Sequence, residues 1–225
     1  MKIRQLHQWN VNIATARSIQ LQLRQMLKFQ KLAKPVHYIA GADVSYSRKS
    51  NLGFAAITIF KYPEMELCEQ KAVSMPIKFP YIPGYLTFRE APILLEAFQK
   101  LSLLPDLVLF DGQGIAHPRG MGIAAHIGLC LDLPSIGCAK SRLIGEFESP
   151  GQNKGDYTPL FYNNQHIGAI VRTRAKVNPV FVSPGHLITI EESVEWVLKT
   201  CTKYRIPEPI RQSHIFVNQM RQKSI

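Results

Sequence analysis

Apolar residues change their spacing along the first third of the chain. From residue 11 to residue 31 they recur at helical intervals with Arg and Lys between them, which predicts an amphipathic helix. Pro35 ends this segment, and apolar runs at 36–45, 52–60 and 65–75 then predict three strands. Because only short, turn-like connections separate these strands, they are expected to form an antiparallel meander.

The rest of the chain alternates between the two patterns. Helices are predicted at 87–101, 121–132, 189–202 and 208–222, strands at 106–110, 135–141, 166–173 and 179–189, and a loop at 145–160. Pro92 falls near a first helical turn, and Thr189 with Glu192 forms a capping box. Alternating helices and strands indicate parallel strands joined by crossover helices.

This order of elements predicts an α/β protein with a ribonuclease H-like fold. The central sheet would be mixed, with the three-strand antiparallel meander followed by parallel strands, and helices would flank it. The first and fourth strands lie side by side in that architecture. Asp43 in the first strand and Asp111 at the end of the fourth are therefore expected to converge.

Composition supports one soluble domain spanning residues 1–225. The chain is 46% hydrophobic, has no apolar run long enough for a membrane span, and begins without the apolar core of a signal peptide. Its four cysteines are scattered and none forms a CxxC motif, so free thiols in a reducing, cytoplasmic setting are expected rather than disulfides or a zinc site. Nothing indicates an obligate protein partner.

The net charge of +11 is concentrated at the two ends. Residues 1–31 carry +6 and residues 199–225 carry +5, whereas the middle of the chain is neutral. A basic excess of this kind favours a polyanionic partner such as nucleic acid, although an ordinary basic protein would show it too.

Carboxylates that converge from different elements suit Mg²⁺, which prefers hard oxygen ligands. Asp43 and Asp111 are two candidates, and Glu90 is the third. Glu90 has an alternative interpretation, because Thr87 and Glu90 fit a capping box at the start of a helix.

The segments around these acids resemble the endonuclease V family, whose members are deoxyinosine-directed repair nucleases. The resemblance spans at least residues 36–214 and rests on an ordered set of motifs: "GADVSYS", "PYIPGYLTFRE", "LVLFDGQGIAHPRGMGIAAHIG", "GCAKSRLIG" and "VNPVFVSPGHLIT". Each motif alone is weak, but the ordered set is specific.

The resemblance implies a catalytic site made of Asp43, Glu90, Asp111, Lys140 and His214. The three acids match the family's Mg²⁺ ligands, and Mn²⁺ is expected to substitute. His214 matches a histidine near the metals. Lys140 matches an active-site lysine suited to negative charge on a phosphate.

The resemblance also implies a wedge and a lesion pocket, formed by Pro80, Tyr81, Ile82, Pro83, Gly84, Gly112, His117 and Arg119. Two prolines would hold an aromatic residue rigidly enough to fill the gap left by a flipped nucleotide; the alternative is that Tyr81 packs into the core. Gly84, Gly112 and Gly114 would admit a base or phosphate. Arg119 would contact a phosphate, and Tyr85 departs from the smaller residue expected after "PYIPG".

The implied function is metal-dependent nicking of inosine-containing nucleic acid in DNA repair. The cut would fall at the second phosphodiester 3′ of the lesion, without excision of the base. DNA is the expected substrate, with inosine-containing RNA as an alternative. The competing interpretations are a junction resolvase, a hybrid-directed ribonuclease, and a non-catalytic nucleic-acid-binding module.

Overall fold

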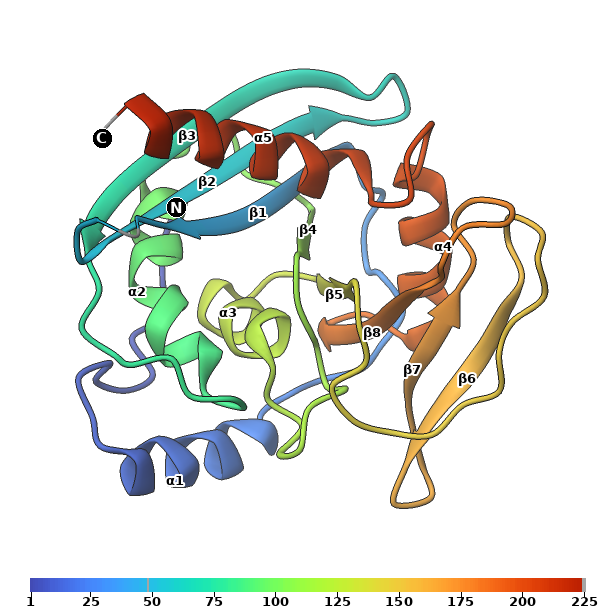
Figure 1. Cartoon of the computed structure of the whole chain (residues 1–225), viewed down its shortest axis with the longest axis horizontal. Helices are drawn as coiled ribbons and strands as arrows, with labels where there is room; N and C mark the ends of the chain where they lie inside the picture. Colours follow the sequence, from blue (N-terminus) through green and yellow to red (C-terminus); the bar gives the residue numbers. More distant parts are fainter. Residues whose placement is uncertain (48, 224–225) are drawn as a thin grey trace.

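The computed structural model describes residues 1–47 and 49–223, and a mixed sheet of eight strands forms its centre (Figure 1). The strands are β1 (Tyr38–Tyr46), β2 (Leu52–Lys61), β3 (Glu66–Pro76), β4 (Leu107–Phe110), β5 (Ser135–Ala139), β6 (Tyr157–Tyr162), β7 (Gln165–Val171) and β8 (Val180–His186). Their order across the sheet is β3-β2-β1-β4-β5-β8-β7-β6.

The first half of the sheet confirms the predicted arrangement. Strands β1, β2 and β3 form the antiparallel meander, and β4 lies parallel to β1 on the other side. Strand β5 continues the parallel part beside β4. In the second half, β8 is antiparallel to both β5 and β7, so the parallel arrangement is limited to β1, β4 and β5.

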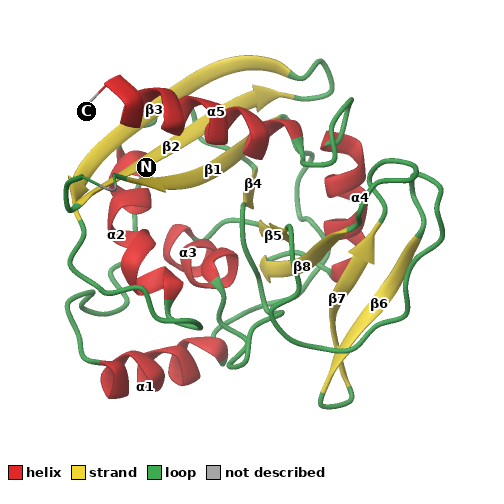
Figure 2. Ribbon diagram, viewed as in Figure 1, coloured by secondary structure: helices red, strands yellow, loops and turns green. Residues whose placement is uncertain are grey.

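Helices cover both faces of the sheet (Figure 2). They are α1 (Ile13–Arg24), α2 (Leu86–Gln99), α3 (Ile123–Leu131), α4 (Ile190–Thr200) and α5 (Glu208–Lys223). Strand β4 is buried on both sides: Val108 and Phe110 pack with α2 and α3, whereas Leu107 and Leu109 pack with α4 and α5. A strand covered on both faces is apolar throughout, which explains its unbroken hydrophobic run.

Helix α1 is shorter than the predicted 11–31. It ends at Arg24, and the residues beyond bond to distant parts of the chain: the Lys28 N–H donates to Nδ1 of His186, and the Leu32 N–H donates to the Glu192 carboxylate. These tertiary hydrogen bonds satisfy the backbone that a longer helix would have used. The capping box of Thr189 and Glu192 at the start of α4 is confirmed.

The predicted loop at 145–160 is wrong at its end, because β6 begins at Tyr157 and pairs with β7. Asn163 and Asn164 both have positive φ angles, as a two-residue hairpin turn requires. Strand β6 shows little hydrophobic alternation because it lies at the sheet edge, where Leu160 is its one buried side chain and Pro159 is tolerated. No helix in the described part of the chain is long and apolar enough to cross a membrane.

Candidate active site

Strand pairing brings Asp43 and Asp111 together, as predicted. In the parallel register of β1 and β4, Ala42 pairs with Phe110, so the next residue of each chain segment is one of the acids. The Asp111 N–H also reaches the Ala42 carbonyl at 3.5 Å. Both carboxylates are largely covered, with 11% of the Asp43 side chain and 18% of the Asp111 side chain exposed.

Glu90 joins these acids from α2 and does not cap that helix. The N-cap residue is Tyr85, no side chain caps the helix, and Pro92 lies inside it rather than in its first turn. Glu90 is instead buried, and its Oε1 accepts a hydrogen bond of 2.8 Å from the hydroxyl of Tyr46. The capping interpretation of Glu90 is therefore wrong.

Burial and electrostatic repulsion disfavour the charged forms of Glu90 and Asp43. Desolvation, together with Asp43 and Asp111, raises the pKa of Glu90 to about 8, although the Tyr46 hydroxyl opposes the shift. Desolvation and Asp111 also raise the pKa of Asp43, against the hydrogen bond from His214. A divalent cation would offset both penalties, so the chemistry of this donor set fits Mg²⁺ or Mn²⁺.

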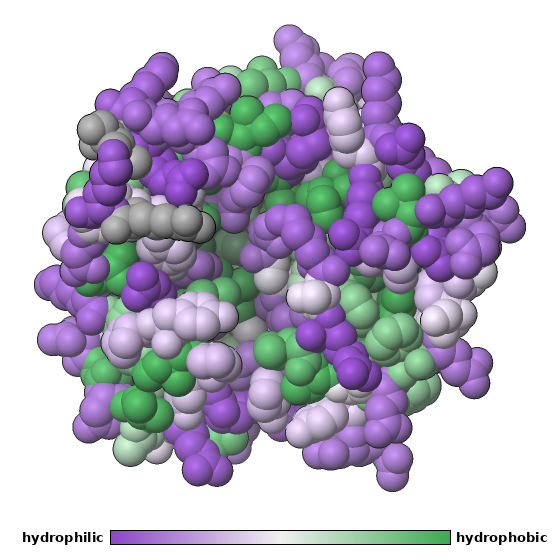
Figure 3. Space-filling model, in the orientation of Figure 1, coloured by the Kyte–Doolittle hydropathy of each residue, from purple (hydrophilic) through white to green (hydrophobic). Residues whose placement is uncertain are grey.

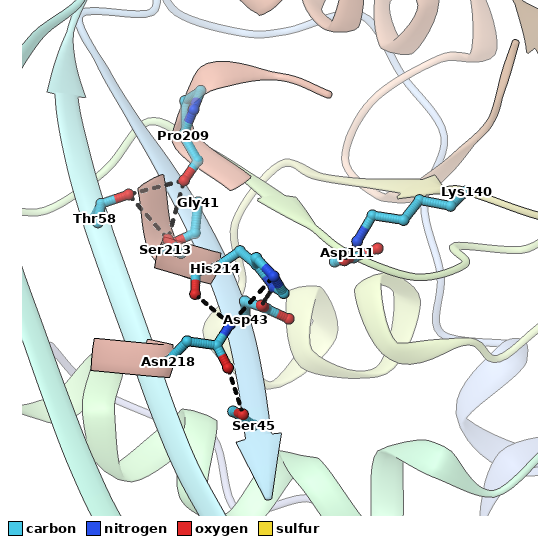
Figure 4. A network of polar contacts seen from close by, with 10 residues as sticks. All are labelled: Gly41, Asp43, Ser45, Thr58, Asp111, Lys140, Pro209, Ser213, His214 and Asn218. Atoms are coloured by element: carbon cyan, nitrogen blue, oxygen red, sulfur yellow. Dashed lines mark hydrogen bonds and ion pairs between the residues drawn. The ribbon is translucent and has the colours of Figure 1, made fainter. Parts of the chain in front are cut away.

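His214 and Lys140 each hold one of the carboxylates (Figure 4). His214, on α5, donates from Nδ1 to Oδ2 of Asp43 at 2.7 Å, and Lys140, just after β5, donates to Oδ2 of Asp111. Among the described residues, no three His, Cys, Asp or Glu side chains converge closely enough to make a ready-formed metal cage. A divalent cation on Asp111 would compete with the Lys140 contact.

Asn218 orients His214 from one turn further along α5. Its Nδ2 lies 3.2 Å from Nε2 of His214 and donates to the His214 carbonyl at 2.8 Å, while its Oδ1 accepts from the Ser45 hydroxyl (Figure 4). Ser213 anchors the same helix to the sheet, because its buried hydroxyl donates to the Gly41 carbonyl at 2.7 Å. These contacts set the position of the imidazole relative to Asp43.

The predicted wedge projects from the surface beside this cluster. We call residues 80–84 the wedge loop. Tyr81 near its tip is 69% exposed, so the alternative that Tyr81 packs into the core is wrong. Pro80 and Pro83 flank it and are exposed as well.

A cavity of about 360 Å³ lies between the wedge loop and Asp111. Residues 81–84 of the wedge loop line one side of it. The other lining residues include Asp111, Gly112, Gln113, His117, Ile123 and the segment 139–143, which contains Lys140. The face of the molecule seen in Figure 1 is hydrophilic over most of its area and is hollowed near its centre (Figure 3). Asp111 and Lys140 both line the cavity, so a ligand in it would lie next to both.

Three predicted binding residues have internal contacts. A Cβ on Gly114 would lie 2.1 Å from the Pro184 carbonyl oxygen, so this glycine is required for the close approach of β8. The side chains of His117 and Arg119 bond to the wedge loop: Nε2 of His117 and Nη2 of Arg119 lie 2.9 and 2.6 Å from the Gly84 carbonyl oxygen. The guanidinium of Arg119, expected on a phosphate, is engaged inside the protein here.

Sequence reasoning missed the residues that orient the site. Tyr46, Asn218 and Gln20 were not candidates, yet each hydrogen-bonds a predicted site residue. The motif "GADVSYS" offered a weak signal for Tyr46, because it places this residue three positions after Asp43, still within β1. Nothing in the sequence pointed to Asn218 or Gln20.

Comparison with known proteins gives consistent matches. The sequence model described as Endonuclease V matches residues 21–215. Endonuclease V of Kosmotoga olearia is 46% identical over 226 residues, which is 100% of this chain and 99% of that protein. Endonuclease V of Dehalococcoides mccartyi is also 46% identical, over 96% of each chain.

Solved structures agree with the fold. Endonuclease V from Streptomyces avermitilis superposes with a TM-score of 0.92 at 31% identity, covering 100% of this chain and 99% of the other. Ciona intestinalis Endonuclease V (D234N), solved in complex with a 23mer DNA containing an inosine followed by a ribo-adenosine, gives a TM-score of 0.84 at 30% identity and covers 95% and 98%. The ribonuclease H-like fold expected from the order of elements is confirmed.

Proposed function

The chain belongs to the endonuclease V family, and from this premise we propose that it is a Mg²⁺-dependent endonuclease that nicks inosine-containing DNA. The cut falls at the second phosphodiester 3′ of the inosine, and the base stays attached to the strand. The observation that carries the proposal is that Asp43 and Asp111 lie at adjacent strand ends, with Glu90 near enough to interact electrostatically with both, and that Asp111 lines a cavity bordered by an exposed wedge.

The three carboxylates would hold Mg²⁺, with Mn²⁺ as a substitute. Their burial and mutual repulsion favour a bound divalent cation over three separate charges. When bound, the ion supplies Lewis-acid stabilisation of the negative charge that develops on the reacting phosphate. Tyr46 keeps Oε1 of Glu90 in place through its hydroxyl, so this ligand is oriented in advance.

Lys140 and His214 have different proposed roles in catalysis. The Lys140 ammonium is half exposed at the rim of the cavity, where it can turn from Asp111 to an incoming phosphate and stabilise its charge. His214 keeps Asp43 oriented from α5, supported by Asn218. Neither residue needs to form a covalent bond to the substrate.

Recognition of inosine uses the wedge loop and the cavity together. Tyr81 would enter the base stack and fill the gap left when the lesion nucleotide flips out. The flipped base would enter the cavity of about 360 Å³, which lies within the usual size of small-molecule sites. Because Asp111 and Lys140 line the same cavity, the strand leaving it runs toward the catalytic groups.

DNA is the proposed substrate and the cytoplasm the proposed location. The endonuclease V structure from Ciona intestinalis contains inosine-bearing DNA, which supports a DNA substrate for this chain. Cys130, Cys138 and Cys201 are buried free thiols, whereas Cys68 is exposed, and unpaired cysteines are typical of a reducing compartment.

One nicking assay tests the substrate class. Matched 5′-labelled substrates would be offered in Mg²⁺: duplex DNA with one inosine, the same duplex without it, inosine-containing RNA, a four-way junction and an RNA–DNA hybrid. Preference for the inosine duplex supports the proposal. Preference for inosine RNA, the junction or the hybrid would assign the corresponding nuclease activity instead, and binding without any cut would identify a binding module.

A further inference from the structure

The carbonyl oxygen of Gly84, at the end of the wedge loop, accepts hydrogen bonds from three side chains. Gly84 has a φ of 79°, in the left-handed region that favours glycine, and its carbonyl oxygen faces a group of side-chain donors. The oxygen accepts from Nη2 of Arg119 at 2.6 Å, from Nε2 of His117 at 2.9 Å and from Nε2 of Gln20 at 3.1 Å. A carbonyl oxygen has two lone pairs, so three side-chain donors crowd one acceptor.

Gln20 is the donor that comes from outside the catalytic motifs. It lies on α1 and is fully buried, with 0% of its surface exposed. Its Oε1 accepts from Nε of Arg119 at 2.6 Å, while its Nε2 also approaches the Met121 carbonyl at 3.4 Å. A flipped amide would put oxygen against two carbonyls, so these contacts fix its orientation.

Arg119 and His117 complete the arrangement. The guanidinium carbon of Arg119 lies 4.3 Å from the ring centroid of Tyr85, directly after the wedge loop, in a cation–π contact. Nδ1 of His117 accepts from the backbone N–H groups of Arg119 and Met121, which leaves the proton on Nε2 for the Gly84 carbonyl. Each donor is therefore oriented by a further contact.

We propose that Gln20 is a positioning residue for base flipping, which fixes the base of the wedge loop through the Gly84 carbonyl and Arg119 and so holds Tyr81 ready to enter the stack. The inference rests on the proposed function. The tip of the wedge loop is exposed, so the contacts at its base must supply rigidity. A wedge held rigid before binding loses less conformational freedom when it enters DNA.

Replacing Gln20 with Met tests this role, because Met has a similar length but cannot make the hydrogen bonds. Nicking of inosine in duplex DNA should fall about tenfold, the cost of buried partners left unpaired, with a smaller loss on single-stranded inosine DNA, where no gap must be filled. Gln22→Met, on the exposed side of the same helix, is the matched control and should leave both rates unchanged. Equal losses on the two substrates would overturn the proposal.

Gln20→Glu separates the two halves of the amide. It keeps an acceptor for Arg119 but removes the donor to Gly84, so the duplex rate should fall as in Gln20→Met. A wild-type duplex rate for Gln20→Glu would overturn the role of the Gly84 contact. Melting curves of each variant identify any that fail to fold, in which case Arg119→Lys, which loses the forked donors but keeps the charge, takes the place of the Gln20 variants.

The decisive arm is a double-mutant cycle with Tyr81→Ala. If Gln20 acts through the wedge, Gln20→Met should cost little more once Tyr81 is removed, because coupled residues do not add. Losses that multiply would show that Gln20 acts elsewhere and overturn the inference. A wild-type protein that fails to nick inosine DNA would instead refute the proposed function, so the two failures are distinguishable.

Discussion

Asp43 and Asp111 are adjacent because of strand register, so their carboxylates can be neutralised without disturbing the sheet. We predict that Asp43→Asn or Asp111→Asn lowers the nicking rate by at least about a thousandfold, because each removes a ligand that supports several kcal/mol of charge stabilisation. Single-turnover nicking in Mg²⁺ measures the rate.

Binding is the control for these two variants. Affinity for inosine-containing duplex, measured in EDTA by gel shift, should stay near the wild-type value because the acids are not expected to contact the base. A near wild-type nicking rate for either variant would contradict the assignment of Asp43 or Asp111 as a metal ligand.

Glu90 offers a prediction about pH. Its pKa is raised from 4.5 to about 8 in the folded protein, so the folded state retains a proton that the unfolded state releases. Wild-type stability should therefore decline as the pH rises from about 5 to about 8, and Glu90→Gln should remove this part of the decline. Melting temperatures in EDTA should show the variant gaining on the wild type as pH rises, while its nicking activity is lost.

Low pH provides the control for the same variant. Gln keeps an acceptor for the Tyr46 hydroxyl, so little stability should be lost at low pH. A melting temperature difference that does not change with pH would contradict the raised pKa of Glu90, and nicking activity that survives would contradict its role as a metal ligand.

The site residues show what a sequence can reveal at this scale. The three acids, Lys140 and His214 carry recognisable chemistry within motifs, and the structure brings them together. Tyr46, Asn218 and Gln20 carry ordinary polar groups that bond to partners far along the chain, as when Gln20 bonds to a residue 64 positions away. The same lack of three-dimensional information made Thr87 and Glu90 resemble a capping box.

The wedge loop is the element that most directly links structure to specificity. Tyr81→Ala should reduce nicking of inosine in duplex DNA by about tenfold or more, since stacking of an aromatic ring on a base is worth about 1–3 kcal/mol. Inosine in single-stranded DNA should lose much less, because nothing has to fill a gap there.

Mn²⁺ affinity is the control for this variant and should be unchanged, because Tyr81 is exposed on the wedge loop whereas Glu90 is buried on α2. Equal losses on duplex and single strand would mean that Tyr81 is a general backbone contact. The wedge would then have to be assigned to another residue.

Periodicity predicted helices and strands correctly where one face of the element is buried. It predicted the ends of elements wrongly where tertiary contacts determine where the element stops. Helix α1 stops at Arg24 because Lys28 and Leu32 bond elsewhere. Strand β6 was not predicted because a strand at the sheet edge with little burial shows weak alternation of apolar and polar residues. Asn163 and Asn164, which form the turn after it, were the available signal. Element ends therefore depended on partners that the local pattern cannot contain.

At the scale of the whole molecule, the basic ends of the chain border the hollowed face. Helices α1 and α5 lie at opposite edges of that face (Figure 1), and Arg17, Arg24, Arg221 and Lys223 are among their basic residues. Affinity for duplex DNA should fall at least about tenfold between about 50 and about 200 mM salt, since phosphate contacts release counterions. Titrations by fluorescence anisotropy at several salt concentrations measure the slope, and a flat dependence would remove charge as an argument for the partner.

The order of elements predicted the strand directions in the half of the sheet formed by β1 to β5, but not in the half formed by β6 to β8. A meander followed by alternating helices and strands places β1 next to β4, which is enough to unite Asp43 and Asp111. Strand β8 is antiparallel to β5 because the chain first forms the β6–β7 hairpin, and the local sequence pattern does not predict the direction in which β8 then joins the sheet. The assignment of residues 1–225 to a single domain stays a prediction.

Mapping the cut at single-nucleotide resolution tests the proposed activity most directly. A duplex with one inosine, labelled at the 5′ end of the lesion strand, would be treated with the wild-type protein in Mg²⁺ and in EDTA, and with Asp111→Asn in Mg²⁺. We predict one product in the first reaction alone, ending at the second phosphodiester 3′ of the inosine with the base retained. Cleavage in EDTA, cleavage by Asp111→Asn, or cuts scattered without regard to the inosine would contradict the proposed activity.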